Sequence, residues 1–375
     1  MATRTWIGTT SDNPTVTTNW VEGVVPVAGD DVVFNSSYSN PCTLVGDFPA
    51  TGQFRSVSFN GYAGTFNFGD YKLHAGQGNL NGVIFDAGTT ANFTCGSGGI
   101  ELYTSSPSSG NYNVIKCNNS NLRNVNFFLR NSGLGRYIDA QTDWYCKNLT
   151  IINYSTYLSN RSYNIYIYGN ITSLAGINNS NVDLNIFAMS LYLRGNGVLD
   201  FSNFIQVYAS VYVEGNYTLN KNASFIINNT TNNSAGVYFN GGTIDCNGYD
   251  LIIQTSGYNY PHYISIPEID NLVIMQQSNY LSSIIFSNTT KINNKFQLFE
   301  RCSSRVPYCS VKSPTTGTKV DIVLGNNCKY LIYGNVLKDL RFNKPVKAFY
   351  SKITNCENII NGEFPDTKVS ICWKI

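Results

Sequence analysis

The chain has 375 residues, of which 13% are charged and 14% aromatic, and its formal net charge is +2 at pH 7. So small a charge excludes a strong overall field for nucleic acid or an anionic membrane, and we expect neither as a partner. No stretch reaches the roughly 18 to 20 apolar residues of a membrane span, and the N-terminus lacks the apolar core of a signal peptide, so we expect a soluble product of the cytosol.

The first 60 residues contain the most specific pattern in the chain. Two tryptophans, Trp6 and Trp20, precede a turn at Pro26 and an apolar strand that ends at Phe34. The first strand of a stacked β-structure has no neighbour on one side, so its edge and the end of its apolar core need a cover. Large aromatic residues in turn-rich sequence suit this purpose, and we predict that residues 1–56 form an N-terminal cap or attachment region.

Asp30 and Asp31 follow Gly29 within the same turn. Two adjacent carboxylates are candidates for a metal site or a catalytic pair. Their position in a Gly-Asp turn before a strand favours local Asx-turn hydrogen bonds instead. We therefore assign both residues to the cap or attachment region and predict no metal and no cofactor.

The pattern Trp-x-Gly, Asn-Trp and Val-Pro-x-Ala-Gly-Asp-Asp-Val-Val-Phe, followed by the alternating run 57–68, resembles the start of β-solenoid proteins on tailed bacteriophage particles. It is also similar to the start of some bacterial surface β-helix repeats. The resemblance covers residues 1–75 and implies an accessory virion protein of the head-fibre, capsid-decoration or tail-fibre type. It implies other capsid or tail proteins as partners and supplies no catalytic residues.

Downstream, short runs of alternating apolar residues recur at steps of about 25 residues, which predicts a series of strands. The runs begin at Val57, Val83, Ile100, Val125 and Leu149. Two polar stretches, 104–111 and 131–143, interrupt the series and are predicted to be loops, where binding residues usually occur.

The stretch 165–254 repeats itself most clearly, with the pattern apolar, Tyr, apolar, variable, Gly. The turn glycines of the four repeats lie 26, 20 and 26 residues apart: Gly169, Gly195, Gly215 and Gly241. Such a period is typical of a repeat architecture, in which each strand ends at a turn. The sequence therefore predicts an all-β fold, a right-handed parallel β-solenoid, in which equal side chains stack into Asn and aromatic ladders.

The four repeats share one tyrosine position: Tyr166, Tyr192, Tyr212 and Tyr238. Rings stacked on one another would stabilise the array, whereas rings with free faces would bind sugars, and we favour the ladder. The tyrosines around the preceding loop are less easily explained by stacking. Tyr154, Tyr157 and Tyr163 are therefore our candidates for contact with a host polysaccharide.

The familiar catalytic motifs are absent: there is no Gly-x-Ser-x-Gly, phosphate loop, dinucleotide fingerprint or His-Glu-x-x-His. His74 and His262 are interpreted as ordinary side chains rather than bases. The enzymatic alternative is a glycan-cleaving spike, which needs two carboxyl groups about 5 to 10 Å apart. Glu214 stands between Arg194 and Asn240 in the repeat register, without an acidic partner, and we predict that the chain is not an enzyme. The sequence does not fix the faces of three further acids: Asp200, Asp245 and Asp250.

The ten cysteines form no CxxC pair and the chain has only two histidines, so no zinc site is expected. We expect free, buried thiols, with a disulfide among the C-terminal cysteines as the alternative. Residues 300–375 contain 12 Lys and Arg against 6 Asp and Glu. We interpret these lysines as protection of strand edges rather than a phosphate-binding surface, and Trp373 as a second cap.

The sequence thus predicts a cap or attachment region (1–56), a β-solenoid (57–299) and basic C-terminal solenoid turns with a cap (300–375). The predicted function is that of a structural protein of a phage virion, assembled in the host cytoplasm and touching host glycans. The alternative is a glycan-binding or glycan-cleaving β-helix. Open ends favour a homodimer or homotrimer, between which the sequence does not choose.

Overall fold

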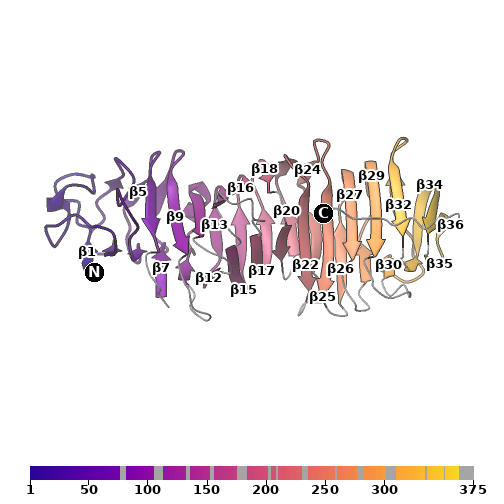
Figure 1. The fold of residues 1–375 in the computed structure, drawn as a ribbon, viewed down its shortest axis with the longest axis horizontal. Coiled ribbons are helices and arrows are strands. Elements are labelled where there is room, and N and C mark those ends of the chain that lie inside the picture. The colour runs from indigo at the N-terminus through magenta and orange to yellow at the C-terminus, as the bar shows by residue number, and fades with distance from the viewer. Residues whose placement is uncertain are drawn as a thin grey trace. The chain divides into compact units, whose positions relative to one another are not determined.

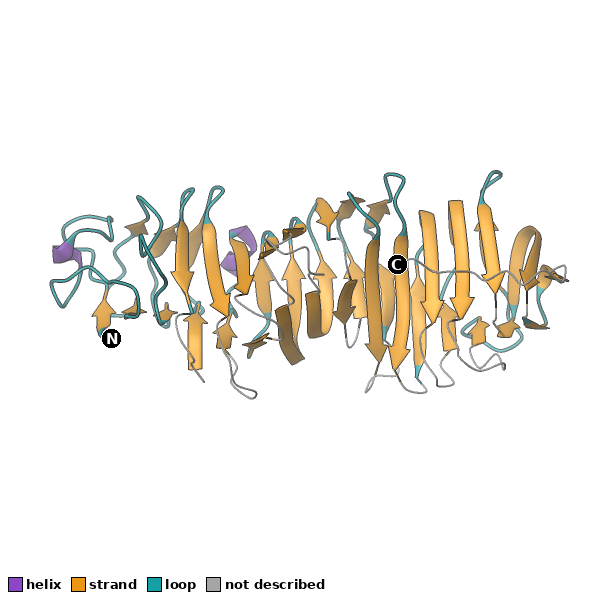
Figure 2. Cartoon of the chain, in the orientation of Figure 1, coloured by secondary structure: helices purple, strands orange, loops and turns teal. Residues whose placement is uncertain are grey.

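Short strands and turns make up nearly all of the described chain (Figures 1 and 2). The computed structural model describes residues 1–76, 82–104, 113–131, 136–152, 156–174, 184–201, 204–207, 210–229, 235–257, 260–276, 283–300, 310–333, 336–349 and 351–362. These ranges contain 36 strands and two short 3-10 helices, η1 (Thr17–Asn19) and η2 (Ser120–Asn124). Alternating Val, Ile, Leu and Phe bury every second side chain, which favours strands over helices. No helix in these ranges is long and apolar enough to cross a membrane.

The chain divides into two units, of which the first comprises Met1–Asn228 with Val237–Leu251 and the second Asn229–Gly236 with Ile252–Ile375. Each unit is an assembly of parallel strands, so the protein is an all-β protein with parallel sheets. The boundaries predicted after residues 56 and 299 stay predictions.

The first unit contains most of the strands of one large sheet, in which each strand pairs in parallel with one or more strands that lie earlier or later in the chain. These strands are β1 (Thr3–Thr5), β2 (Asp31–Val33), β4 (Ser56–Ser58), β7 (Gly82–Asp86), β10 (Asn113–Lys116), β12 (Arg136–Ala140), β13 (Trp144–Cys146), β15 (Thr156–Ile167), β17 (Leu184–Leu193), β19 (Phe204–Val207), β20 (Ser210–Val213), β22 (Ala223–Asn229) and β23 (Gly236–Phe239).

Two further parallel sheets belong to the first unit. The larger contains β6 (Lys72–Ala75), β9 (Gly99–Thr104), β11 (Asn126–Asn131), β14 (Leu149–Ile152), β16 (Ile171–Leu174), β18 (Gly197–Asp200), β21 (Asn216–Leu219) and β24 (Thr243–Asp245). The smaller contains β3 (Cys42–Thr43), β5 (Thr65–Asn67) and β8 (Asn92–Thr94).

The second unit contains parallel pairs between strands that are mostly two or three apart along the chain, such as β26 with β28 and β30 with β33. Its strands are β25 (Leu251–Gly257), β26 (Pro261–Ser265), β27 (Glu268–Gln276), β28 (Ser283–Phe286), β29 (Thr290–Glu300), β30 (Ser310–Lys312), β31 (Val320–Leu324), β32 (Lys329–Tyr333), β33 (Val336–Lys338), β34 (Leu340–Phe349), β35 (Lys352–Thr354) and β36 (Glu357–Gly362).

The strands predicted at Val57, Val83, Ile100, Val125 and Leu149 are present, but the single series expected from the sequence is divided between sheets. The runs that begin at Val57 and Val83 lie in β4 and β7, whereas those at Ile100 and Leu149 lie in β9 and β14 of the larger second sheet. The loop predicted at 131–143 is wrong in part, since Arg136–Ala140 form β12. Its Ile138 pairs with Asn113 of β10 and Leu158 of β15, so strand pairing outweighs the local polar composition.

The seven cysteines among the described residues are free thiols, as expected from the sequence. Five of them are buried, namely Cys42, Cys117, Cys146, Cys246 and Cys328. Burial raises the pKa of the Cys42 and Cys117 thiols well above the ordinary value, so they serve as small apolar core residues. Cys302, Cys309 and Cys372, as well as Trp373, lie outside the described residues.

The four turn glycines meet two different steric demands. A Cβ added at Gly195 would lie 1.6 Å from the carbonyl oxygen of Tyr168, and one at Gly215 would lie 1.7 Å from the oxygen of Gly195. A Cβ added at Gly169 would lie 2.3 Å from the side-chain oxygen of Asn148. Gly241 instead has free space but a φ of +85°, which a residue with a Cβ rarely adopts. Gly195 and Gly215 are therefore required because neighbouring backbone approaches closely, and Gly241 because of its backbone conformation.

We predict that Gly195→Ala lowers the free energy of unfolding by about 1 to 3 kcal/mol, because the backbone must move to admit the new methyl group. Gly46→Ala is the matched control, since a Cβ there meets nothing within 4 Å. Urea unfolding of both variants tests this explanation. Equal stability of the two variants would show that close approach at Gly195 imposes no constraint.

Candidate functional site

The two N-terminal tryptophans form one buried aromatic cluster. Trp6 and Trp20 are 0% and 1% exposed, and their rings meet edge to face with centroids 5.2 Å apart. Phe34 packs against both, at 5.9 and 6.2 Å. Each indole N–H donates to a backbone oxygen, Trp6 to Asn40 at 3.1 Å and Trp20 to Pro14 at 2.8 Å. The cluster is thus fully packed and its polar groups are satisfied.

Asp30 and Asp31 have separate structural partners rather than a shared site. Asp30 accepts hydrogen bonds from the backbone N–H of Ala2 at 2.9 Å and from Arg4 Nε at 3.2 Å. Burial acts to raise the pKa of Asp30, but these bonds and one from Val27 outweigh it and lower the pKa. Asp31 instead accepts from Arg55 Nε at 2.7 Å and from the Ser56 hydroxyl at 2.6 Å.

Pro26, the fifth residue of the predicted cap or attachment set, is buried between exposed apolar neighbours. Val24 and Val27 on either side of it are 45% and 59% exposed. Within the described chain, no group of three or more His, Cys, Asp or Glu side chains is arranged to hold a metal ion.

The outer edge of the first strand is occupied by the segment that follows Trp20. The backbone N–H of Thr5 donates to the carboxylate of Glu22, and the N–H of Val21 donates to the Thr5 oxygen, both at 2.9 Å. These two bonds satisfy the groups of Thr5 that point away from β2.

Of the three predicted glycan-contact tyrosines, the described residues include one side chain, that of Tyr163. Tyr154 lies outside the described residues. The backbone of Tyr157 belongs to β15, and its side chain lies outside the description. Tyr163 lies on the same strand and is 40% exposed. The side chain of Tyr163 is therefore placed where a ligand can reach it.

The repeat tyrosines form the ladder that the sequence predicts. The ring centroids are 4.7 Å apart from Tyr166 to Tyr192 and from Tyr192 to Tyr212, and 5.2 Å apart from Tyr212 to Tyr238, with nearly parallel planes. Tyr145 of β13 extends the ladder at 4.7 Å from Tyr166. Because each inner ring covers the face of the next, these faces are not available for stacking on a sugar.

A second ladder of asparagines follows the adjacent turns. Each bond links an asparagine side-chain oxygen to the next turn: Asn148 Nδ2 to Asn126 at 2.7 Å, Asn170 N to Asn148 at 2.7 Å, Val198 N to Asn170 at 2.8 Å and Asn216 N to Asn196 at 3.2 Å. In three of these bonds a side-chain oxygen accepts from a backbone N–H group, and in the first it accepts from the Asn148 side-chain amide. The Asn ladder predicted from the sequence is confirmed.

We predict that Tyr192→Ala costs about 1 to 3 kcal/mol of unfolding free energy, because it breaks the stacking contacts with Tyr166 and Tyr212. Tyr163→Ala serves as the control for the loss of an exposed tyrosine on the neighbouring strand. Denaturant unfolding of both variants measures the difference. If both variants lose the same unfolding free energy, the stacking contacts of Tyr192 contribute nothing to stability.

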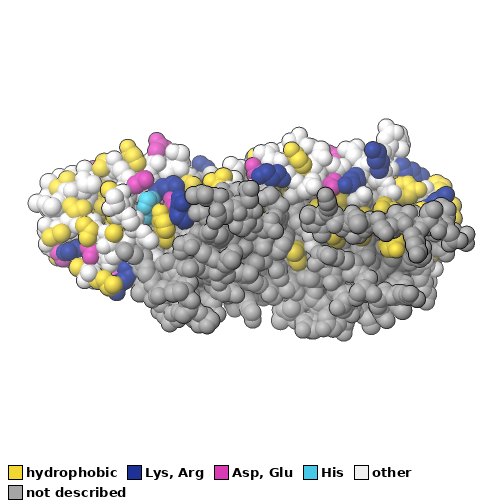
Figure 3. Space-filling model, viewed as in Figure 1, with side chains coloured by type: hydrophobic (Ala, Val, Ile, Leu, Met, Phe, Trp, Pro, Cys, Tyr) yellow, Lys and Arg dark blue, Asp and Glu magenta, His cyan; other side chains and the backbone are white. Residues whose placement is uncertain are grey.

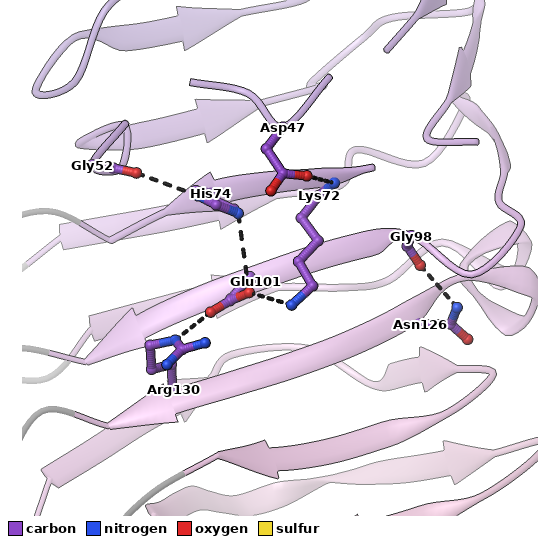
Figure 4. Close-up of polar contacts among 8 residues, drawn as sticks. All are labelled: Asp47, Gly52, Lys72, His74, Gly98, Glu101, Asn126 and Arg130. Carbon is purple, nitrogen blue, oxygen red and sulfur yellow. Dashed lines mark hydrogen bonds and ion pairs between the residues drawn. The ribbon is translucent and has the colours of Figure 1, made fainter. Parts of the chain in front are cut away.

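A cluster of charged and aromatic side chains lies on the outward face of β6, β9 and β11 (Figure 4). The strand register places His74 of β6 beside Glu101 of β9, and Glu101 beside Phe128 of β11. The alternate residues Leu73 and Leu102 are fully buried, so the strands direct the intervening side chains outward. On the face drawn in Figure 3, a histidine (cyan) lies beside basic side chains (dark blue).

Glu101 is the centre of this cluster. Lys72 Nζ lies 2.7 Å from Glu101 Oε2, and Arg130 Nε bonds Oε1. Burial acts to raise the pKa of Glu101, but the hydrogen bonds and charges of Lys72 and Arg130 outweigh it and lower the pKa. Burial and the charge of Glu101 raise the pKa of Tyr103 to about 12. Glu101 is therefore ionised and Tyr103 protonated at neutral pH.

His74 and Tyr103 complete the cluster. His74 Nδ1 lies 3.3 Å from the Gly52 oxygen, and Nε2 lies 4.0 Å from Glu101 Oε2 without a hydrogen-bond partner among the described residues. The His74 and Tyr103 rings are 5.7 Å apart. Glycoside hydrolysis needs two carboxyl groups, whereas this cluster has one carboxylate, and both of its oxygens bind cations. The cluster therefore suits recognition of a charged ligand better than hydrolysis of a glycan.

Glu214, Asp200 and Asp245 are paired with cations or with a backbone group. Glu214 Oε2 lies 2.8 Å from Arg194 Nε, at the adjacent repeat position that the register predicts. Asp200 lies 2.8 Å from Lys221 Nζ. Asp245 accepts a hydrogen bond from the N–H of Asn247 at 2.9 Å.

The sequence interpretation missed the Glu101 cluster. Lys72, Glu101 and Arg130 occupy outward positions of strands that are 27 to 29 residues apart in the sequence. This common placement can be recognised only when the strand register is known. Comparison of the chain with models of known families, with curated proteins and with solved structures finds no match in any of the three.

Proposed function

We propose that the chain is a right-handed parallel β-solenoid with an N-terminal cap and functions as a structural component of a phage particle, as a head fibre, capsid decoration or tail fibre. The observation that supports this best is the tyrosine ladder, since equal side chains stack in register along successive strands of the first unit. Such stacking is typical of a rigid repeat body. Rigidity suits a part that projects from a particle.

The N-terminal region supports the proposed cap. Its aromatic cluster contains the buried rings of Trp6 and Trp20, and Glu22 with Val21 occupies the outer hydrogen-bonding groups of Thr5. A strand edge blocked in this way resists pairing with other chains. The exposed Val21, Val24 and Val27 then provide an apolar surface for attachment to other virion proteins.

Localisation on purified particles tests the proposal. Particles of the virus that encodes the chain are purified on a density gradient, analysed by mass spectrometry and imaged by cryo-electron microscopy. Particles from a gene deletion serve as the control. We expect the chain in the particle fraction and density on head or tail that disappears in the deletion. Absence of the chain from purified particles would exclude a virion component.

The alternative, a glycan-binding β-helix, has the Glu101 cluster in its favour. A glycan-cleaving chain would release new reducing ends from host polysaccharide, whereas the proposed structural protein would release none.

A further inference from the structure

We propose that the cluster on β6, β9 and β11 binds a carboxylate-bearing sugar unit of an acidic polysaccharide. The Lys72–Arg130 surface is defined as Lys72, His74, Glu101, Tyr103, Phe128 and Arg130. This inference goes beyond the proposed structural role and does not depend on it.

The surface carries more positive than negative charge. Lys72 and Arg130 share the single carboxylate of Glu101, whereas the pair Arg194–Glu214 and the pair Lys221–Asp200 in the same unit are one to one. Asp47 accepts a hydrogen bond from the backbone N–H of Lys72 at 2.9 Å, not from its ammonium group. The two cations therefore outnumber the one carboxylate that they bind.

Glu101 fixes the two cations without competing at the surface. Its side chain is 2% exposed, while those of Lys72 and Arg130 are 29% and 36% exposed. An ammonium group has three N–H donors and a guanidinium group five, so donors remain on both after they bind Glu101. A ligand carboxylate would meet cations that are already held in place, which lowers the entropic cost of binding.

Two aromatic rings lie beside the cations. Lys72 Nζ is 4.3 Å from the centroid of Phe128, and the Arg130 guanidinium is 5.8 Å from that of Tyr103. Both rings are partly exposed. Rings beside cations suit a sugar acid, because the apolar C–H face of the sugar packs on a ring while its carboxylate binds the cations. A bare anion would use only the cations.

Binding is measured by calorimetry with four probes: tetragalacturonate, a hyaluronan tetrasaccharide, oligomeric sialic acid and neutral maltotetraose. We expect at least one acidic probe to bind, more weakly as salt is added, and maltotetraose not to bind. Inorganic phosphate tests for simple anion binding. Phosphate affinity equal to that of the best sugar, binding of maltotetraose, or no binding of any acidic probe would each overturn the proposal.

Two variants and one control assign the site. Arg130→Gln should weaken binding of the acidic probe at least tenfold, because it removes a cation. Glu101→Gln should strengthen binding, because it removes the negative charge beneath the two cations while the amide oxygen of glutamine can still accept a hydrogen bond from one of them. Arg194→Gln removes an arginine from a one-to-one pair elsewhere in the unit and should leave affinity unchanged. A purely structural cluster predicts a lower melting temperature for Glu101→Gln with no gain in affinity, and that result would refute the assignment.

Discussion

Replacement of Trp20 by alanine is expected to lower the free energy of unfolding of the first unit by about 3 to 5 kcal/mol. Trp20 is 1% exposed and packs against Trp6, Phe34 and Phe48, with centroid distances of 5.2 to 6.2 Å. Truncation removes these contacts and opens a cavity that the packed rings cannot fill. It also removes the indole donor of the buried bond to the Pro14 oxygen.

Differential scanning calorimetry measures the effect as a fall in melting temperature. Val21→Ala is the control, because Val21 is the next residue and is 54% exposed, so its truncation should change stability little. The melting temperature of Trp20→Phe should lie between those of Trp20→Ala and Val21→Ala. A Trp20→Ala chain that melts at the wild-type temperature would show that the aromatic cluster does not hold this end of the unit together.

The sequence was most informative where the same residues recur. The pattern apolar, Tyr, apolar predicts both the strands and their register, because equal residues in successive repeats become neighbours, as Tyr192 and Tyr212 do. Tyr145 was missed although Trp144 and Cys146 flank it in the same pattern. The segment that follows it, Lys147-Asn148, lacks the glycine by which the repeats were aligned.

The division into sheets was not predictable from the period. Each step of about 25 residues contains two or more short strands, and alternation alone does not say which of these strands pair. The strand at Ile100 follows that at Val83 in sequence and pairs instead with β6 and β11. The run 136–140 was likewise too polar to be recognised without its partners.

The Lys72–Arg130 surface shows the same limit for function. Lys72, Glu101 and Arg130 stand 29 residues apart in successive strands and look like isolated surface charges in the sequence. Parallel pairing is what brings a buried carboxylate between two cations. Asp30 and Asp31 show the reverse case, because residues adjacent in the sequence bind different partners, Arg4 and Arg55.

His262 is expected to make the stability of the second unit depend on pH. It lies on β26 beside Ile284 of β28, is 1% exposed, and neither ring nitrogen has a hydrogen-bond partner among the described residues. Burial lowers the pKa of His262 from 6.5 to about 4. Above pH 6.5 the ring is neutral in the folded and the unfolded chain, so it adds no pH dependence there.

Between pH 6.5 and about 4 the unfolded chain binds a proton that the folded chain does not. The free energy of unfolding therefore falls as the pH falls through this window, by about 3 kcal/mol when the window has been crossed. His262→Phe keeps a buried ring without nitrogen atoms and should abolish this part of the loss. Urea unfolding above and below the window compares wild type, His262→Phe and, as the control that keeps His262, His74→Gln. Other groups titrate in all three chains, so the decisive quantity is the difference between their slopes of unfolding free energy against pH. A His262→Phe chain with the wild-type slope would show that His262 is not protonated on unfolding.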